Sequence, residues 1–190
     1  MRIISGKFKG KKISLPKDKY TRPLKDMVKE SIFNVISHSN EIGIKINNSN
    51  ILDLFSGSGS FGLEAISRGA KNVTFIENYE EAVNILKKNI QELNSLELCQ
   101  VIHKSCFDYL DNIESKKNMY DIVFLDPPFK EKNTSLLIEK IIKKGILKKK
   151  NLIVMHRHKA ENINFNSEVN ILDTRLYGIS KIIFARQLSF

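Results

Sequence analysis

The sequence has few of the residues that stabilise small secreted proteins or build metal centres. Its 190 residues include only two cysteines, Cys99 and Cys106, which are too few for a disulfide framework and lack a histidine pair at metal-site spacing. No apolar run approaches the length of a membrane span, and the first residues lack the apolar segment of a signal peptide. Internal repeats and low-complexity tracts are also absent. We therefore expect a cytoplasmic protein with no metal and no membrane contact.

Acidic residues are scarce relative to basic ones, and the imbalance is concentrated at one end. The chain has 31 Lys and Arg residues against 21 Asp and Glu, which gives a formal net charge of +10. Residues 1–30 alone contain ten basic and three acidic residues. Such an excess suits a polyanionic partner such as a nucleic acid. The length suits one domain with a small appendage.

From residue 50 onward, predicted strands alternate with predicted helices. Strands are expected to begin near Asn50, Val73, Leu98, Asp121 and Leu152. Helices are expected over residues 61–68, 80–93 and 134–144. This order predicts a doubly wound parallel sheet. Two last strands, 169–176 and 181–186, flank a Tyr177-Gly178 turn and predict an antiparallel hairpin.

Residues 1–49 are predicted to form a basic extension to the domain formed by residues 50–190. Short strands at 2–5 and 11–15 would flank a turn, and the apolar residues between Leu24 and Ile36 follow helical spacing. Thr21 is a plausible cap and Pro23 suits the first turn. Residues 43–49 are expected to be a polar linker. The lysine run 148–150 is expected to be a solvated turn, with a nucleic-acid contact as the alternative.

A glycine-rich loop follows the first of these strands. Gly57, Gly59 and Gly62 have the spacing G-x-G-x-x-G between a predicted buried strand and a predicted helix. Glycines permit a tight turn and let a ligand approach the helix N-terminus closely. Glu77, at the end of the next strand, has about the spacing of a ribose-binding acid. The motif fits a nicotinamide dinucleotide or S-adenosylmethionine, and its alternative is an ordinary β–α turn.

Three observations favour S-adenosylmethionine. Asp53 lies inside the strand before the glycines, where its carboxylate could support the loop and the amino-acid end of the cofactor. The chain has no obvious second domain for a dehydrogenase substrate. A hydride-transfer site also has no need for the segment Asp126-Pro127-Pro128-Phe129, which directly follows the apolar run 122–125.

This segment suits methylation of an exocyclic amine. Its two prolines end the strand and lack N–H donors, so carbonyls are presented where ligands bind in open α/β sheets. An amine could donate hydrogen bonds to Asp126 and to a proline carbonyl, which would orient its lone pair and stabilise developing positive charge. Phe129 would stack on the base, worth roughly 1–3 kcal/mol. The alternative is a Pro-rich turn with Asp126 as a cap and Phe129 in the core. The four histidines form no metal or triad pattern, and we assign them no catalytic role.

Several motifs, in order along nearly the whole chain, carry a family resemblance. They are residues 1–10, Thr21-Arg22-Pro23, residues 28–34, residues 53–59, residues 126–129 and Tyr177-Gly178. Together they resemble the bacterial small-subunit rRNA guanine-N2 methyltransferases of the RsmD type. The resemblance implies a Rossmann-like S-adenosylmethionine-dependent methyltransferase fold, mostly parallel and closed by a C-terminal antiparallel hairpin, with a small basic N-terminal β-hairpin and helix. It also implies methyl transfer to N2 of one guanine in 16S rRNA, on an assembling small ribosomal subunit.

The resemblance also implies roles for particular residues. The catalytic residues would be Asp126, Pro127, Pro128 and Phe129. The cofactor would be bound by Asp53, Phe55, Gly57, Gly59, Glu77, Cys106 and Asp126. The backbone of Cys106 is the candidate adenine contact, because Ser105 stands where the family usually has an acid. Arg22 is a candidate RNA contact, and the excess basic charge of residues 1–30 adds Lys7, Lys9, Lys11 and Lys12 as candidates.

Two other functions stay open at this point. An adenine-N6 methyltransferase acting on DNA or RNA could use the same acidic-Pro-Pro-aromatic segment, although such enzymes usually need an added target-recognition region, for which the chain has little room. A non-catalytic rRNA-binding assembly factor could use the basic N-terminus alone. The intact glycine loop, Asp126 and Phe129 argue against that second alternative.

Overall fold

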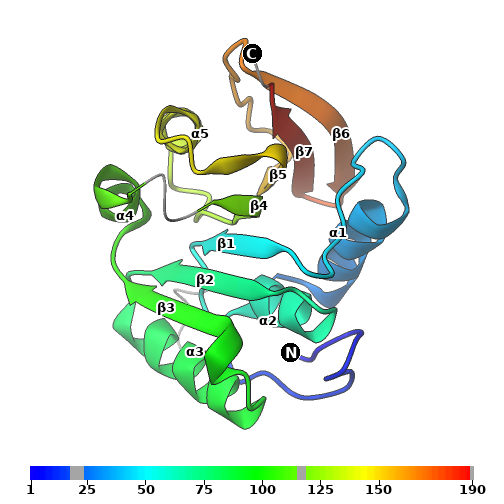
Figure 1. Ribbon diagram of the computed structural model, residues 1–190, viewed down its shortest axis with the longest axis vertical. Coiled ribbons are helices and arrows are strands. Elements are labelled where there is room, and N and C mark those ends of the chain that lie inside the picture. Colours follow the sequence, from blue (N-terminus) through cyan, green and yellow to red (C-terminus); the bar gives the residue numbers. More distant parts are fainter. Residues whose placement is uncertain (18–23, 115–118, 189–190) are drawn as a thin grey trace.

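The computed structural model describes residues 1–17, 24–114 and 119–188, which form a seven-stranded sheet in the order β3-β2-β1-β4-β5-β7-β6 (Figure 1). Strands β1 to β5 run parallel, and β7 is antiparallel to both β5 and β6. The strands are β1 (Asn50–Leu54), β2 (Asn72–Glu77), β3 (Cys99–His103), β4 (Tyr120–Leu125), β5 (Leu147–His158), β6 (Val169–Tyr177) and β7 (Ser180–Gln187). The predicted parallel sheet closed by an antiparallel hairpin is confirmed.

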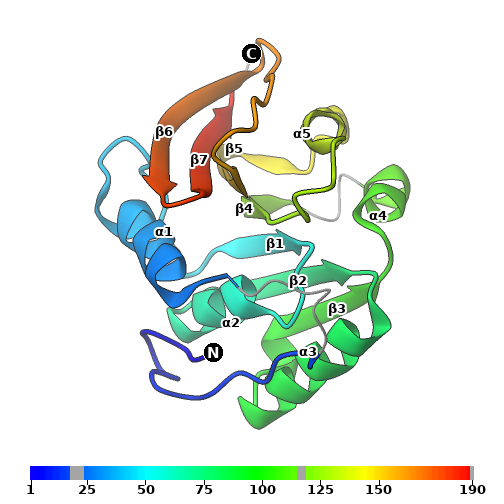
Figure 2. The ribbon, with the colours of Figure 1, turned by 180° about the vertical axis from the view of Figure 1, so that it is seen from behind.

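Helices cover both faces of this sheet (Figures 1 and 2). One hydrophobic cluster joins α1, α2 and α3 to the sheet, and a second joins α4 and α5 to the opposite face. Successive strand residues alternate between the two clusters, as the pleat requires: Phe124 belongs to the first and Leu125 to the second. The helices are α1 (Asp26–His38), α2 (Ser60–Ser67), α3 (Glu80–Glu92), α4 (Cys106–Asn112) and α5 (Thr134–Lys143), with a 3₁₀ turn at Leu96–Leu98.

Helix α4 and the start of β5 differ from the sequence-based expectation. Helix α4 was not predicted; the Ser105 side chain caps it by accepting a hydrogen bond from the Asp108 backbone N–H at 3.0 Å. Strand β5 begins at Leu147, so the lysine run 148–150 lies in a strand and the prediction of a turn is wrong, although Lys149 and Lys150 are exposed as expected. This extension pairs with Tyr120, and the Lys148 ammonium lies 2.7 Å from the Asp121 carboxylate.

The N-terminal segment pairs only briefly with itself. The two predicted strands are reduced to one antiparallel bridge between Arg2 and Lys12. Backbone hydrogen bonds from Ile3 N–H to the Lys11 carbonyl and from Ile13 N–H to the Met1 carbonyl, each at 2.9 Å, join the two segments. The backbone N–H groups of Ile4 and Ser5 donate instead to the Glu64 carboxylate of α2, at 2.7 and 3.0 Å. The segment is therefore bound to α2 through its backbone and is not a free-standing hairpin.

Much of the predicted extension shares a hydrophobic core with the sheet. The predicted helix is α1, whose apolar face is buried in the first cluster together with Ile3 and Ile13. Ile44 and Ile46, in the predicted polar linker, are buried as well. Thr21, Pro23 and Arg22 lie outside the described residues. The division of the chain at residue 49 stays a prediction. No helix in the described ranges is long and apolar enough to cross a membrane.

Candidate active site

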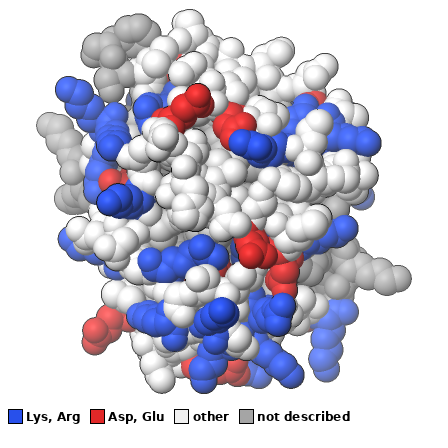
Figure 3. Space-filling view, turned by 90° about the vertical axis from the view of Figure 1, so that its right-hand side faces the viewer, with Lys and Arg blue, Asp and Glu red and all other residues white. Residues whose placement is uncertain are grey.

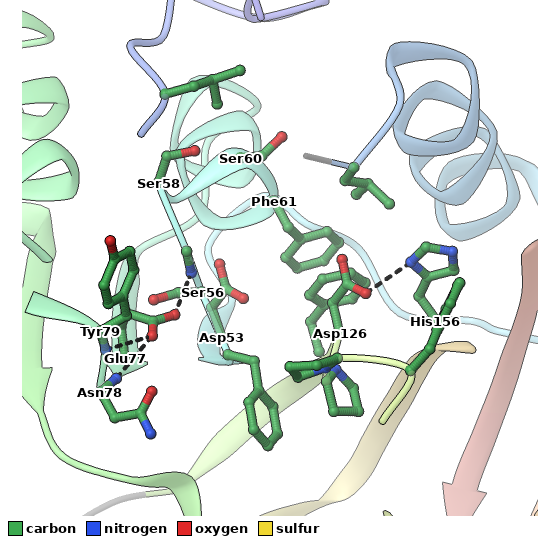
Figure 4. A pocket seen from close by; sticks show the side chains of 18 of the residues that line it. Asp53, Ser56, Ser58, Ser60, Phe61, Glu77, Asn78, Tyr79, Asp126 and His156 are labelled. Atoms are coloured by element: carbon green, nitrogen blue, oxygen red, sulfur yellow. Dashed lines mark hydrogen bonds and ion pairs between the residues drawn. The ribbon is translucent and has the colours of Figure 1, made fainter. Parts of the chain in front are cut away.

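A cavity of about 850 Å³ lies at the carboxyl ends of the central strands (Figure 4). The loop after β1, the end of β2, the segment after β4 and His156 of β5 all line it. Leu15 and Leu24 add lining from the N-terminal part of the chain. The connections from β1 and β4 lead to opposite faces of the sheet, so the cavity lies at a topological switch point, where open α/β sheets bind ligands.

The three glycines of the loop have different structural roles. A Cβ at Gly62 would come within 2.3 Å of the Phe75 ring, so this glycine lets α2 pack closely on β2. A Cβ at Gly59 would meet Leu86 at 2.4 Å, and Gly59 is not among the residues that line the cavity. Gly57 does line it, has a φ of 52° and has open space where a Cβ would point. Gly57 is therefore the position at which a ligand can approach the backbone.

Glu77 connects this loop to the end of β2. One carboxylate oxygen accepts a hydrogen bond from the Gly57 backbone N–H at 2.7 Å. The other accepts from the N–H groups of Asn78 and Tyr79, each at 2.9 Å (Figure 4). A carboxylate offers about four acceptor positions, so some capacity is left for a ligand hydroxyl. Glu77 thus holds the loop in shape and can still accept a hydrogen bond from a ribose.

Asp53 lies beneath the loop and is buried. Its Oδ2 atom accepts a hydrogen bond from the Gly62 backbone N–H at 3.0 Å, which ties β1 to the start of α2. Burial raises the pKa of the Asp53 carboxyl well above its ordinary value; the Gly62 bond opposes this, and the charges of Asp126 and Glu77 add to it. Three carboxyl groups around one cavity suit a ligand that carries positive charge. S-Adenosylmethionine, with its sulfonium and ammonium groups, fits this set of residues.

Two other predicted cofactor residues are Phe55, which directly follows β1, and Cys106, the first residue of α4. Phe55 lines the cavity and has a φ of 59°, a backbone conformation that is uncommon for a residue other than glycine. The Cys106 side chain is buried at the start of α4 and is not among the cavity-lining residues. Burial raises the pKa of the Cys106 thiol, with a hydrogen bond from the Phe55 backbone opposing the shift. An adenine contact at the Cys106 backbone stays a prediction.

Asp126 lies at the cavity, held by a histidine. Its Oδ1 atom is 2.8 Å from Nδ1 of His156 (Figure 4). Nε2 of His156 is 2.9 Å from the Ser180 hydroxyl. Within the described parts of the chain, no residue forms a hydrogen bond with the other carboxylate oxygen, Oδ2. Asp126 therefore offers one acceptor atom to a ligand while the other is fixed by the protein.

The proline carbonyls are held by Arg157, whose side chain is fully buried. One terminal nitrogen donates to the carbonyls of Pro127 and Pro128 at 3.0 and 3.1 Å, and the other donates to the Glu131 carbonyl at 2.7 Å. Its Nε donates to the Glu161 carboxylate at 2.8 Å. A substrate amine that binds either proline carbonyl must therefore share it with Arg157 through the second lone pair.

Phe129 is half-buried at the cavity and belongs to neither hydrophobic cluster. Its ring meets those of His156 and His158 edge-on, with centroids 6.0 and 5.3 Å apart. The alternative that Phe129 is a core residue therefore finds no support in the packing. Sequence reasoning missed both His156 and Arg157. The available signal was the run of polar residues 156–158, which directly follows the apolar run 152–155 of β5.

The predicted RNA-contacting lysines are exposed and lie outside the cavity. Basic side chains outnumber acidic ones on the side of the molecule that carries the N-terminal loop and α1 (Figure 3). The Lys7 ammonium lies 4.6 Å from the centroid of the Phe8 ring. Leu15, at the cavity, follows shortly after the predicted contacts Lys7, Lys9, Lys11 and Lys12 in the chain. The described residues contain no group of His, Cys, Asp or Glu suited to hold a metal ion.

Comparison with known proteins shows which family this sequence resembles. Residues 1–186 match the model of a family described as conserved hypothetical protein 95. A ribosomal RNA small subunit methyltransferase D from Haemophilus influenzae is 36% identical over 94% of this chain and 90% of its own length. Its counterpart from Buchnera aphidicola subsp. Baizongia pistaciae is 38% identical over 85% of this chain and 78% of its own.

Solved structures agree with these sequence matches. A putative methylase from Haemophilus influenzae has a TM-score of 0.80 and 34% identity, covering 99% of this chain and 98% of its own. A putative methyltransferase from Escherichia coli has a TM-score of 0.86 and 25% identity, covering 100% and 99%. The predicted Rossmann-like methyltransferase fold is confirmed. The chain belongs to the family of the ribosomal RNA small subunit methyltransferase D proteins.

Proposed function

We propose that the protein transfers a methyl group from S-adenosylmethionine to the exocyclic N2 of a guanine in 16S rRNA. Its family and fold support the coarser statement that it is an S-adenosylmethionine-dependent rRNA methyltransferase. The proposal of an exocyclic amine as the methyl acceptor rests on one observation. Asp126 and the half-buried ring of Phe129 line the same cavity as Glu77 and Gly57. An acceptor and a stacking surface are what an aromatic amine requires.

The cofactor would occupy the part of the cavity formed by the glycine loop. Bound there, it supplies a methyl group already activated on a sulfonium. Glu77 would accept hydrogen bonds from the ribose hydroxyls, and the open backbone at Gly57 would allow close approach. The buried Asp53 would support the loop and the positively charged amino-acid end.

The guanine would leave its stack to reach Asp126 and Phe129. Phe129 would hold the base by its face, while Oδ2 of Asp126 accepts a hydrogen bond from the amine. This contact directs the nitrogen lone pair and stabilises the positive charge that develops on nitrogen. Asp126 is also the nearest candidate to accept the proton that nitrogen loses. Pro127 and Pro128 shape the segment and offer carbonyls that Arg157 already polarises.

The RNA partner would be the small ribosomal subunit or an assembly intermediate. The exposed lysines of the N-terminal loop supply positive charge near the C-terminal end of α2, where Lys7 and Phe8 bond to Ser67, and Leu15, later in the same segment, reaches the cavity. Contacts to phosphates bring affinity without base recognition, so these lysines would position the RNA while the cavity selects the base. Arg22, the other predicted contact, stays a prediction, as does the location in the cytoplasm.

Labelled cofactor provides the test. Wild-type protein is incubated with 16S rRNA, small-subunit particles and adenine-containing DNA, and the methylated base is identified. We expect label on guanine N2, with transfer strongly reduced in Asp126→Ala and Phe129→Ala while cofactor affinity stays within several-fold. Phe165→Ala is the matched control, because Phe165 is also partly buried but does not line the cavity. Label on adenine N6 would support the adenine methyltransferase, and RNA binding without transfer would support the assembly factor.

A further inference from the structure

A hydrogen-bonded chain crosses three adjacent strands beside the cavity. It begins at Asp126, which follows β4, continues through His156 of β5 and ends at Ser180, the first residue of β7. Strands β4, β5 and β7 are neighbours in the sheet, which brings together three residues from distant parts of the sequence. The side chains of His156 and Ser180 are buried, whereas that of Asp126 is 20% exposed.

We infer that His156 is a positioning residue for methyl transfer, which fixes the orientation of the Asp126 carboxylate and is itself oriented by Ser180. The inference rests on the function proposed above. An ionised Asp126 can only accept, so Nδ1 of His156 carries the proton and donates to Oδ1. Nε2 then accepts from the Ser180 hydroxyl, which holds the ring in one tautomer.

The consequence for Asp126 is geometric. A partly exposed carboxylate without this bond would rotate and bind water with either oxygen. With Oδ1 fixed, Oδ2 is the oxygen that stays available at the cavity. Displacing a positioning group by about 1 Å can cost on the order of 100-fold in rate, so a modest rotation of this carboxylate would be measurable.

Two conservative substitutions separate this role from a purely structural one. The amide nitrogen of asparagine falls near the place of histidine Nδ1, so His156→Asn keeps a donor to Asp126. The amide nitrogen of glutamine falls near that of Nε2, so His156→Gln can reach Ser180 but not Asp126. Both replace a buried polar side chain by a carboxamide, which makes each the control for the other.

The experiment measures kcat, KM for RNA and cofactor affinity for both variants and for Ser180→Ala, alongside their unfolding temperatures. We expect His156→Gln to lose about 10- to 100-fold in kcat with KM and cofactor affinity within about threefold. His156→Asn should recover most of that loss, and Ser180→Ala should lose several-fold. Equal kcat in the two His156 variants, or a loss confined to KM, would overturn the positioning role.

The wild-type protein distinguishes failure of the proposed function from failure of the positioning role of His156. If the wild-type protein puts no label on guanine N2, the proposed function fails and the positioning role loses its basis. If the wild type labels guanine N2 and His156→Gln does so at the same rate, only the positioning role fails. Because the comparison uses two carboxamide variants, it does not require His156→Ala to fold.

Discussion

Replacing Arg157 by methionine should destabilise the protein markedly. The guanidinium is fully buried, donates to three carbonyls of the segment after β4 and forms an ion pair with Glu161. Methionine keeps much of the side-chain volume, so the substitution removes polar contacts and little packing. The Glu161 side chain is 25% exposed and can recover some hydration, so we take the lower end of the cost of breaking a buried pair, about 3 kcal/mol.

This cost converts to a fall in Tm. A domain of this length loses roughly 2–4 °C for each kcal/mol, so we expect a decrease of about 6–12 °C by calorimetry. Arg175→Met is the matched control, because Arg175 also lies in a strand but is exposed and forms a surface ion pair with Asp173, two residues earlier. Its Tm should stay close to that of the wild-type protein.

A functional measurement accompanies the thermal one. At a temperature where both proteins are folded, Arg157→Met should transfer methyl groups more slowly than Arg175→Met, because the Asp126–Phe129 segment has lost its anchor. A Tm decrease no larger than that of the Arg175 control would refute the reasoning. It would mean that the segment is held by its prolines and packing, and that Arg157 contributes little.

Three other predictions concern the cofactor, pH and RNA. Titration calorimetry should show binding of S-adenosylmethionine or its demethylated product and none of NAD; Glu77→Ala should weaken cofactor binding by about 1–3 kcal/mol, whereas the exposed Glu80→Ala should not. Saturable NAD binding would overturn the cofactor assignment. The raised pKa of Asp53 means that its protonated form adds stability, which is lost as pH rises through the folded-state pKa. Asp53→Asn should therefore match the wild-type Tm in acid and exceed it at neutral pH and above; the opposite trend would contradict the assigned direction. Charge reversal of four lysines should weaken RNA binding, with cofactor affinity unchanged, and should flatten the log–log salt dependence of binding by somewhat less than one unit for each phosphate that is no longer neutralised. The four lysines are Lys7, Lys9, Lys11 and Lys12. An unchanged slope would mean that the RNA contacts other residues, of which 143–150 are the next candidates.

The sheet was predictable from periodic patterns in the sequence. Hydrogen bonds from side chains to the backbone of a distant segment were not predictable in this way. The strand and helix order from residue 50 onward follows from alternation and from glycine placement. The N-terminal strands were overextended, because nothing local in the sequence shows that Glu64 of α2 takes the N–H groups of Ile4 and Ser5. Helix α4 was missed since it is short and depends on a cap at Ser105.

The candidate site was predictable where its residues are consecutive. The glycine loop with Glu77, and the Asp126–Phe129 segment, are local motifs whose strands meet at one edge of a parallel sheet, and both line the same cavity. His156 and Arg157 act on that segment from another strand. Their roles depend on the adjacency of β4 and β5, which single-residue patterns do not reveal.

The identity of the methylated base is the most direct test of the proposed methyl transfer to guanine N2. Small-subunit RNA and particles are treated with wild-type protein and labelled cofactor, and the labelled nucleotide is mapped. We predict a single product, N2-methylguanine in 16S rRNA, which is lost in Phe129→Ala and retained in part in Phe129→Tyr, where the stacking face remains. Label on adenine, or transfer to guanine that does not change in Phe129→Ala, would contradict it.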